Sequence, residues 1–358
     1  MTLWDETSLV QAVAQVGPLD EKAMAEAQRR WNTIAKPLGS LGMLETDIIR
    51  IAGITGDANV DLSKKAVVAM CGDNGVVAEG VTQTGQEVTA IVTENMGRGD
   101  TSVCRMARVA GAEVIPVDIG VARPVTGETI RQACVRRGTA NMTQGPAMTR
   151  EEAAKAVLTG IRLVEELKAG GCRLLATGEM GIGNTTPSSA IVSVLLNRDP
   201  AEVTGRGAGL SSEGLERKVQ AIRTAIAVNR PDPSDPLDVL HKVGGLDIAG
   251  LAGVFLGGAI HRIPVLVDGF ISSAAALVAQ AFCPRAADYM LASHASNEPA
   301  GQMVLQALGL RPFLYAGMCL GEGTGAVAVM PLLDMALAVY REMVAFEETE
   351  IEAYQPLS

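Results

Sequence analysis

The chain has 358 residues, of which 48% are hydrophobic, 20% are charged and only 3% are aromatic, and its formal net charge is -10. An acidic chain lacks the basic surface that nucleic acids and anionic membranes require, so we expect neither as a partner. The longest apolar run, 248–260, is too short to cross a bilayer, and residues 1–10 lack the pattern of a signal peptide, which together predict a cytoplasmic protein.

The first 60 residues are predicted to be helical. Asp20 is a suitable N-cap for a helix over 21–35, and the glycine-containing segment KPLGSLG (36–42) separates it from a second apolar helix over 44–54. After Pro331 the helical periodicity returns. We therefore predict a small helical domain formed by residues 1–60 together with 331–358.

Between these segments, short apolar runs end in small or acidic residues and are separated by helical patterns. Their lack of alternation predicts strands buried on both faces of a parallel sheet. A capping box at Thr149–Glu152 and the pair Asp235-Pro236 mark helix starts. The expected strands are 66–71, 113–117, 173–177, 264–267, 289–292 and 311–316.

This pattern predicts an α/β fold with a doubly wound, mostly parallel, Rossmann-like sheet in a large catalytic domain over 61–330. Ligands of such sheets bind outside the carboxyl ends of the strands, so the active site is expected there.

The segment GEMGIGNTTP (178–187) follows an expected strand and precedes an apolar helix. Its glycines allow close backbone approach, and Thr185 together with the helix N-terminus can donate hydrogen bonds to a phosphate. It lacks the lysine of a Walker A loop and the spacing of the dinucleotide fingerprint, which argues against a nicotinamide-dependent oxidoreductase. The alternative is a tight turn that needs small residues.

Three charged residues are candidates for chemistry. Glu322, in LGEGTG, is held by flanking glycines in a loop where a carboxylate can act as a base, or it is an exposed turn residue. Asp268 ends an apolar strand, or it caps the helix that follows. Lys218 lies on a helical stretch where most lysines are surface charges.

Metal and disulfide signals are missing from the sequence. The six cysteines include no C-x-x-C pair and the three histidines no paired spacing, so we expect no metal, no disulfide and no cofactor.

Taken in order along almost the whole chain, several motifs resemble those of the nicotinate-nucleotide:dimethylbenzimidazole phosphoribosyltransferases. They are KPLGSLGMLE (36–45), GDNGVVAEGVT (72–82) with QEVT (86–89), GTANMTQGPAMTREEA (138–153), TGEMGIGNTTPSSAI (177–191), GGLDIAGLAG (244–253), DGFISSAAAL (268–277), SHASNEPAG (293–301) and LGEGTGA (320–326).

The resemblance implies transfer of phosphoribose from nicotinate mononucleotide to an aromatic base, without metal or cofactor, in cobamide biosynthesis. It implies that Glu322 is the general base and that Glu179, Lys218 and Asp268 lie beside it. The implied phosphate and ribose site comprises Gly178, Met180, Gly181, Ile182, Gly183, Asn184, Thr185 and Ser296. The implied base pocket comprises Asp73, Asn74, Thr82, Gln86 and Leu320.

One departure from the family pattern leaves the identity of the base open. The first-strand loop reads Asp73-Asn74 where the family usually has Asp-His, and TQTG replaces a serine-aromatic-proline run. Relatives that use phenol or p-cresol work as heterodimers of homologous chains. We therefore expect 5,6-dimethylbenzimidazole and a homodimer, with a phenolic base or one subunit of a heterodimer as the alternative. A non-catalytic subunit would have no chemical reason to retain Glu322, Glu179 and Lys218 together.

Overall fold

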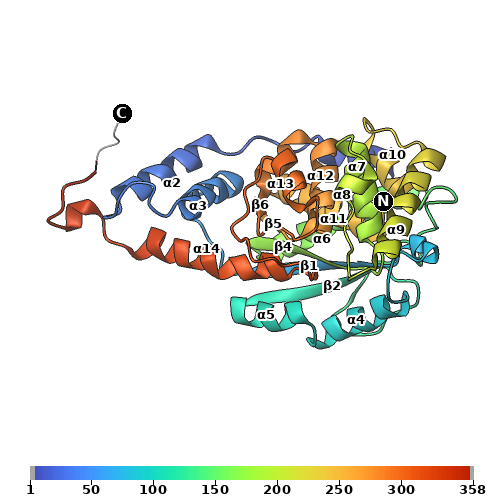
Figure 1. Cartoon of the computed structure of the whole chain (residues 1–358). Coiled ribbons are helices and arrows are strands. Elements are labelled where there is room, and N and C mark those ends of the chain that lie inside the picture. Colours follow the sequence, from blue (N-terminus) through green and yellow to red (C-terminus); the bar gives the residue numbers. More distant parts are fainter. Residues whose placement is uncertain (1–4, 355–358) are drawn as a thin grey trace.

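A six-stranded parallel sheet forms the centre of the computed structural model, which describes residues 5–354. The strands lie in the order β3-β2-β1-β4-β5-β6, which is the Rossmann order and confirms the predicted fold class. Their bounds are β1 Lys65–Gly72, β2 Ala112–Gly120, β3 Arg131–Gln132, β4 Leu174–Met180, β5 Val265–Val267 and β6 Met290–Ala292. Figure 1 shows helices above and below this sheet.

The central strand β1 explains why the apolar runs do not alternate with polar residues. Successive side chains of a strand point to opposite faces, and both faces of β1 are covered. Ala66, Val68 and Met70 belong to one hydrophobic core, whereas Val67, Ala69 and Cys71 belong to the other.

The helices divide between these two cores. The first core receives α6 (Arg150–Ala169), α7 (Thr185–Leu195), α9 (Ser212–Asn229), α10 (Pro236–Val243), α11 (Leu246–His261), α12 (Phe270–Phe282) and α13 (Gly301–Ala307). The second receives α2 (Glu21–Thr33), α3 (Met43–Thr55), α4 (Glu87–Arg98), α5 (Ser102–Ala110) and α14 (Thr324–Glu342). The remaining short elements are α8 (Pro200–Val203), η1 (Gly75–Glu79), η2 (Pro284–Tyr289) and η3 (Phe346–Glu348).

The predicted helix starts are present. Asp20 caps α2, Thr149 and Glu152 form a reciprocal capping box on α6, and Asp235 caps α10 ahead of Pro236. Each side chain accepts hydrogen bonds from backbone N–H groups that the helix itself leaves unpaired.

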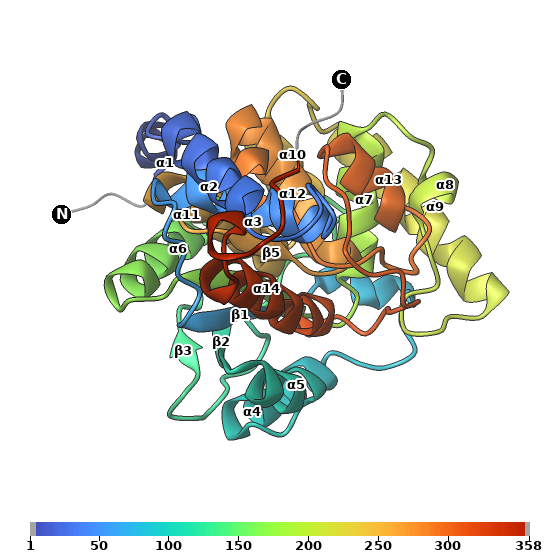
Figure 2. The same ribbon diagram turned by 90° about the vertical axis from the view of Figure 1, so that its left-hand side faces the viewer.

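The C-terminal helix packs beside the N-terminal helices, as the periodicity after Pro331 predicts (Figure 2). The rings of Trp31 and Tyr340 lie 5.1 Å apart, and Arg30 donates to the Tyr340 carbonyl at 3.0 Å. However, α14 already begins at Thr324 and continues through Pro331, so one helix crosses the expected domain boundary. The division into 1–60 plus 331–358 and 61–330 stays a prediction, and its outermost residues, 1–4 and 355–358, lie outside the described residues.

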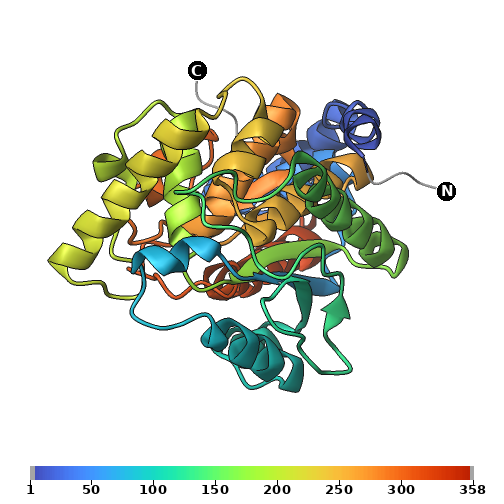
Figure 3. The ribbon, with the colours of Figure 1, turned by 90° about the vertical axis from the view of Figure 1, so that its right-hand side faces the viewer.

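The packing of α1 and α14 bears on the predicted helical domain and on the expected lack of a membrane span. α1 (Glu6–Val13) packs against α6 and α11 instead of joining α2 and α3 (Figure 3). By length and composition α14 could cross a membrane, but it packs against α3, α5 and β4 and places ten side chains or glycines in the interior.

The strand predicted over 311–316 is wrong. Only Leu314 forms a bridge there, with His294, after which the chain turns away and exposes 70% of Tyr315. Pro312 has no N–H to offer a longer ladder. β3 was missed because its two residues are exposed and polar, so no apolar run marks it.

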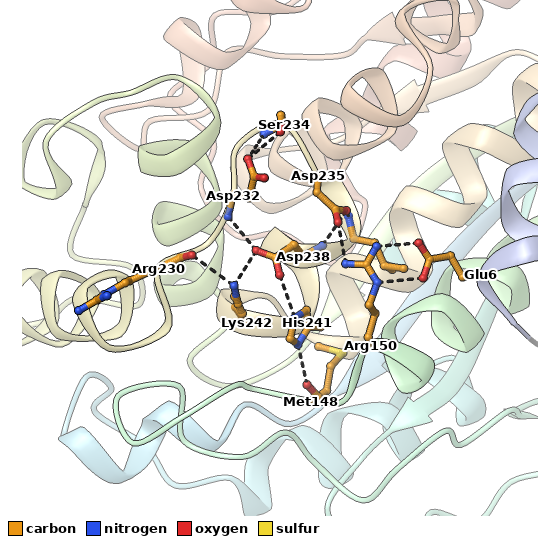
Figure 4. Close-up of polar contacts among 11 residues, drawn as sticks. Glu6, Met148, Arg150, Arg230, Asp232, Ser234, Asp235, Asp238, His241 and Lys242 are labelled. Carbon is orange, nitrogen blue, oxygen red and sulfur yellow. Dashed lines mark hydrogen bonds and ion pairs between the residues drawn. The ribbon is translucent and has the colours of Figure 1, made fainter.

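A charge cluster joins α1, α6 and α10 at the surface (Figure 4). Arg150 makes ion pairs with Glu6 at 2.6 Å and with Asp235 at 2.7 Å. Asp238 pairs with Lys242 at 2.9 Å and lies 3.2 Å from His241. In this α10 charge cluster, the carboxylates of Glu6, Asp235 and Asp238 therefore each have a cationic or titratable partner from the same chain.

Candidate active site

A cavity of about 620 Å³ opens where β4, β5 and β6 end. Glu179 and Met180 are the last residues of β4, Asp268 follows β5, and His294 follows β6. The other predicted residues in its lining are Gly181, Ile182, Gly183, Asn184, Thr185, Ser296, Thr82, Leu320 and Glu322. The cavity thus lies at the edge of the sheet that the strand pattern predicted.

The LGEGTG loop adopts a backbone conformation that depends on its glycines. Gly321, Glu322 and Gly323 have φ angles of 89°, 62° and 101°, all in the left-handed region, which is uncommon for a glutamate. A non-glycine residue is held in such a conformation most often at functional sites. Glu322 is one of the residues that line the cavity, and its Oε2 accepts a hydrogen bond from the N–H of Val103, in the first turn of α5, at 3.1 Å.

Gly178 lies beneath this loop and does not line the cavity. A Cβ at Gly178 would come within 2.2 Å of the Glu322 carbonyl oxygen. The first glycine of the GEMGIGN motif therefore allows the loop that carries Glu322 to lie against β4.

Asp268 caps a helix, but a different helix from the one considered in the sequence. It does not cap α12, which has no side-chain cap. Its carboxylate accepts hydrogen bonds from the N–H groups of Gly323 at 3.1 Å and Ala326 at 2.9 Å, at the start of α14. Burial raises the pKa of Asp268 to about 6, despite these donors. Asp268 thus fixes the loop that presents Glu322.

Glu179 is buried between two further polar groups. Its carboxylate accepts hydrogen bonds from the Asn184 side-chain amide and, at 3.4 Å, from the N–H of Glu322. Burial, with the nearby carboxylates of Asp247 and Asp268, raises the pKa of Glu179 to about 8. Only 7% of the residue is exposed, and this part faces the cavity.

The GIGNT turn (181–185) leads into α7 and lines the cavity next to two basic residues from other parts of the chain, Arg206 and Lys218. Gly183 has a φ of 88°, and the N–H of Ile182 donates to the Thr89 hydroxyl at 3.0 Å. Lys218, which the sequence alone would place at the surface, is 1% exposed. Its ammonium group donates to Thr185 Oγ1 at 2.7 Å and to the Gly205 carbonyl at 3.1 Å. Burial lowers the pKa of Lys218 to about 8.

Three polar residues were not singled out from the sequence. Arg206 lines the same part of the cavity, and its guanidinium donates to the Leu210 carbonyl at 2.7 Å. Its signal was a basic residue inside the glycine-rich run TGRGAG (204–209). His294 lines the cavity beside Gly269, and Asp247 lies behind Glu179. No local signal distinguishes these two from ordinary core or capping residues.

The residues predicted for the base pocket divide into two groups. Thr82 and Leu320 line the cavity, and Leu320 is 60% exposed. Asp73, Asn74 and Gln86 lie outside its lining. Asp73 accepts a hydrogen bond from the N–H of Ala122 at 2.7 Å, and Gln86 donates to the Asn74 carbonyl at 3.1 Å, so these contacts organise the loop behind the wall.

Comparison with known proteins gives the family. A family model described as Phosphoribosyltransferase matches residues 16–351. The chain belongs to this phosphoribosyltransferase family. It is 49% identical over 348 residues to the nicotinate-nucleotide-dimethylbenzimidazole phosphoribosyltransferase of Acetivibrio thermocellus, which covers 97% of this chain and 99% of that protein. The enzyme of the same name from Ruminiclostridium cellulolyticum is 47% identical over 347 residues, with coverage of 97% and 99%.

Solved structures of this phosphoribosyltransferase family have the same fold. A crystal structure of CobT from Thermus thermophilus matches with a TM-score of 0.87 and 42% identity, over 91% of this chain and 98% of that chain. A second structure from that organism, titled as the nicotinate-nucleotide-dimethylbenzimidazole phosphoribosyltransferase, has a TM-score of 0.86 and 41% identity, over 92% and 98%. The resemblance in the sequence motifs is therefore confirmed, and the chain is a phosphoribosyltransferase.

Proposed function

We propose that this phosphoribosyltransferase moves the phosphoribosyl group of nicotinate mononucleotide to 5,6-dimethylbenzimidazole. The products are α-ribazole 5'-phosphate and nicotinate, as required for the nucleotide loop of cobamides. One observation carries the assignment to this cavity. Its wall holds Glu179 and Asp268 where β4 and β5 end and Arg206 near α7, and the buried Lys218 lies directly behind Thr185 of the same wall.

The acidic end suits the cationic part of the substrate. The ring nitrogen of nicotinate mononucleotide is quaternary, so its bond to C1' breaks with both electrons on nitrogen and neutral pyridine nitrogen departs. Positive charge then develops on the ribose, as in glycoside hydrolysis. Ionised Glu179 is positioned to stabilise this charge in a buried site, where the interaction is stronger than in water.

The basic end suits the 5'-phosphate. The turn from Gly181 to Asn184 leads into the N-terminus of α7, and the Thr185 hydroxyl there accepts a hydrogen bond from the Lys218 ammonium. A helix N-terminus with a nearby cation is a favourable phosphate site. Arg206 and Ser296 complete this proposed phosphate and ribose site.

We assign the general base to Glu322. The unprotonated ring nitrogen of the benzimidazole uses its lone pair to form the new bond to C1', and the Glu322 carboxylate accepts the proton from the other ring nitrogen. Attack on the face opposite to the departing nicotinate converts the β-nucleotide into the α-riboside. The N–H of Val103 holds the same carboxylate in place before the base arrives.

A product assay tests the function. Purified protein would be incubated with nicotinate mononucleotide and, separately, with 5,6-dimethylbenzimidazole, adenine and phenol, and the riboside phosphates would be separated by chromatography. We expect the dimethylbenzimidazole product at the highest kcat/KM. Preference for phenol would support the alternative of a phenol-using homologue, which the names of the relatives do not favour. If no base gives a product, the proposal is overturned.

The proposal includes a homodimer in the cytoplasm. Exposed apolar side chains on α14 and directly after it, including Met335, Met343 and Val344, support a contact between copies. All six cysteines are free thiols, in keeping with a reducing compartment. Light scattering on the purified chain would distinguish a homodimer from a monomer that needs a homologous partner.

A further inference from the structure

Asp247 is a fully buried carboxylate to which the proposed mechanism gives no part. It lies in the first turn of α11, directly behind Glu179 as seen from the cavity, and it does not line the cavity itself. The glycine pair before it, Gly244-Gly245, brings the chain close to the end of β1.

Asn184 joins Asp247 to Glu179. The side-chain nitrogen of Asn184 donates to a carboxylate oxygen of Glu179 and, at 3.0 Å, to Oδ2 of Asp247. A side-chain amide has two N–H protons, so both are used. The bridge is neutral, and it therefore leaves two buried carboxylates close together without a compensating charge.

The surroundings supply no cation to either carboxylate. Among residues 5–354, neither Glu179 nor Asp247 forms an ion pair. Asp73 faces Asp247 from the loop after β1, and Asp268 faces Glu179 from the loop after β5. Two cations of this region, Arg206 in the cavity wall and Lys218 behind Thr185, make their hydrogen bonds to other groups. Two like charges in such a site are not both ionised.

Hydrogen-bond geometry indicates which carboxylate keeps a proton. Both carboxylates have donors that favour the ionised form: the Asn184 amide and the Glu322 N–H for Glu179, and the Asn184 amide with the N–H groups of residues 247 and 248 for Asp247. The two carboxylates differ in one unpartnered oxygen. Oδ1 of Asp247 has no partner, and the same holds for Oδ1 of Asn74. A Cβ at Gly245 would lie 2.5 Å from the first oxygen and 2.6 Å from the second, so the two oxygens border the same small space. A proton on Oδ1 of Asp247 could be donated in a hydrogen bond to Oδ1 of Asn74, which would give both oxygens a partner.

We propose that Asp247 is a positioning residue for phosphoribosyl transfer, which holds one proton against Asn74 and so leaves Glu179 ionised toward the ribose. This proposal rests on the proposed function for its effect on turnover, although the proton itself can be observed without catalysis. Burial and neighbouring carboxylates raise the pKa of both Asp247 and Glu179. Because the bridged carboxylates titrate as a pair, the pair retains one proton near pH 7, and the two unpartnered oxygens of Asp247 and Asn74 locate that proton on Asp247.

The decisive variant is Asp247→Asn. Its amide reproduces the protonated carboxyl group, because its oxygen can accept from Asn184 while its nitrogen donates to Oδ1 of Asn74. We expect kcat/KM near pH 7 within about threefold of wild type. The fall of kcat/KM at alkaline pH, which begins as the pair loses its last proton, should move upward by roughly one pH unit or more. Asp247→Leu, which loses the contact with Asn184, should reduce kcat at least about tenfold.

The matched control is Asp118→Asn. Asp118 is equally buried, but it pairs with Arg137 at 2.7 Å and lies outside the cavity lining, so its removal should leave the alkaline limb in place. If Asp247→Asn abolishes turnover, or leaves the alkaline limb where it is, Asp247 does not hold the proton and the proposal fails.

An infrared measurement tests the proton without any turnover. The carbonyl band of a protonated carboxylic acid should be present in wild type and Asp118→Asn at pH 7, and absent in Asp247→Asn. An unchanged band would overturn the role of Asp247 even if the enzyme is active. Conversely, failure of the product assay with all bases would leave this band intact, so the two failures are distinguishable.

Discussion

Two groups of carboxylates in this molecule are built on similar residues and have opposite electrostatic properties. In the α10 charge cluster, Arg150 lowers the pKa of Glu6 by a direct hydrogen bond. Burial acts to raise the pKa of Asp238, but the Asp232 N–H, Lys242 and His241 together bring it below its usual value. At the cavity and directly behind it, burial raises the pKa of Glu179, Asp247 and Asp268, and none of the three forms an ion pair among residues 5–354.

The difference indicates separate roles for the two groups. Where a carboxylate has a cationic partner within the chain, its charge is already compensated in the folded protein, and the ion pairs of Arg150 link helices. Carboxylates that are buried without cations destabilise the empty protein, and a cationic ligand or a proton can compensate for this. The unpaired cluster is therefore the place for chemistry, and the following predictions test that contrast.

The largest effect is expected for Glu322→Gln. Glutamine can still accept the hydrogen bond from the Val103 N–H, but it cannot accept a proton, so kcat should fall at least about 100-fold with little change in melting temperature. Glu347→Gln, at an exposed position in η3, is the control and should retain full activity. Steady-state kinetics with dimethylbenzimidazole would measure kcat for both variants. A normal kcat in Glu322→Gln would contradict the assignment of Glu322 as the general base.

Lys218→Met should act on substrate binding more than on the chemical step. The variant keeps the buried volume of the stem but loses a cation near Thr185, where the phosphate is proposed to bind. A hydrogen bond to a charged group contributes roughly 1.5–3 kcal/mol, so KM for nicotinate mononucleotide should rise about 10- to 100-fold. Lys22→Met, at an exposed position of α2, should leave KM unchanged. An unchanged KM in Lys218→Met would place the phosphate elsewhere.

The empty cavity should make the protein less stable as the pH rises. Burial and neighbouring carboxylates raise the pKa at which the Glu179–Asp247 pair loses its shared proton well above the values of about 3.9 and 4.3 of the free side chains. Between those pH values the folded state binds more protons than the unfolded state, so the stabilisation is greatest below the unfolded pKa and is lost as the pH rises through the folded one. Differential scanning fluorimetry from pH 5 to 8.5 should show a falling melting temperature for wild type and a flatter curve for Asp247→Asn. Parallel curves would show that the pair holds no proton in the folded protein.

The smallest effect is expected in the α10 charge cluster. Arg150→Met removes two ion pairs that are each about one-third to one-half exposed, so it should cost about 1 kcal/mol or less per pair. The loss should shrink at high salt, and kcat/KM should be unchanged. Urea unfolding with and without added salt measures the first effect. A large loss of activity in this variant would contradict the separation between the two groups of carboxylates.

The sequence predicted the fold well because burial of parallel strands leaves a local record. The runs at 66–71, 173–177 and 264–267 are apolar on both faces, and the helix starts at Asp20, Thr149 and Asp235 carry their own caps. The strand expected over 311–316 failed because apolar composition does not reveal whether a neighbour offers a continuous hydrogen-bonding edge.

The sequence by itself determined the family, the edge of the sheet where the site lies, and the loop that carries Glu322, because glycine runs and strand ends are local features. Only the tertiary structure decided that Lys218 is buried, that Asp268 caps α14 and not α12, and that Asp247 meets Glu179 through Asn184. These properties depend on residues that are distant in the chain. The protonation of a carboxylate is fixed by the groups that surround it in space, and the linear order of residues does not encode that environment locally.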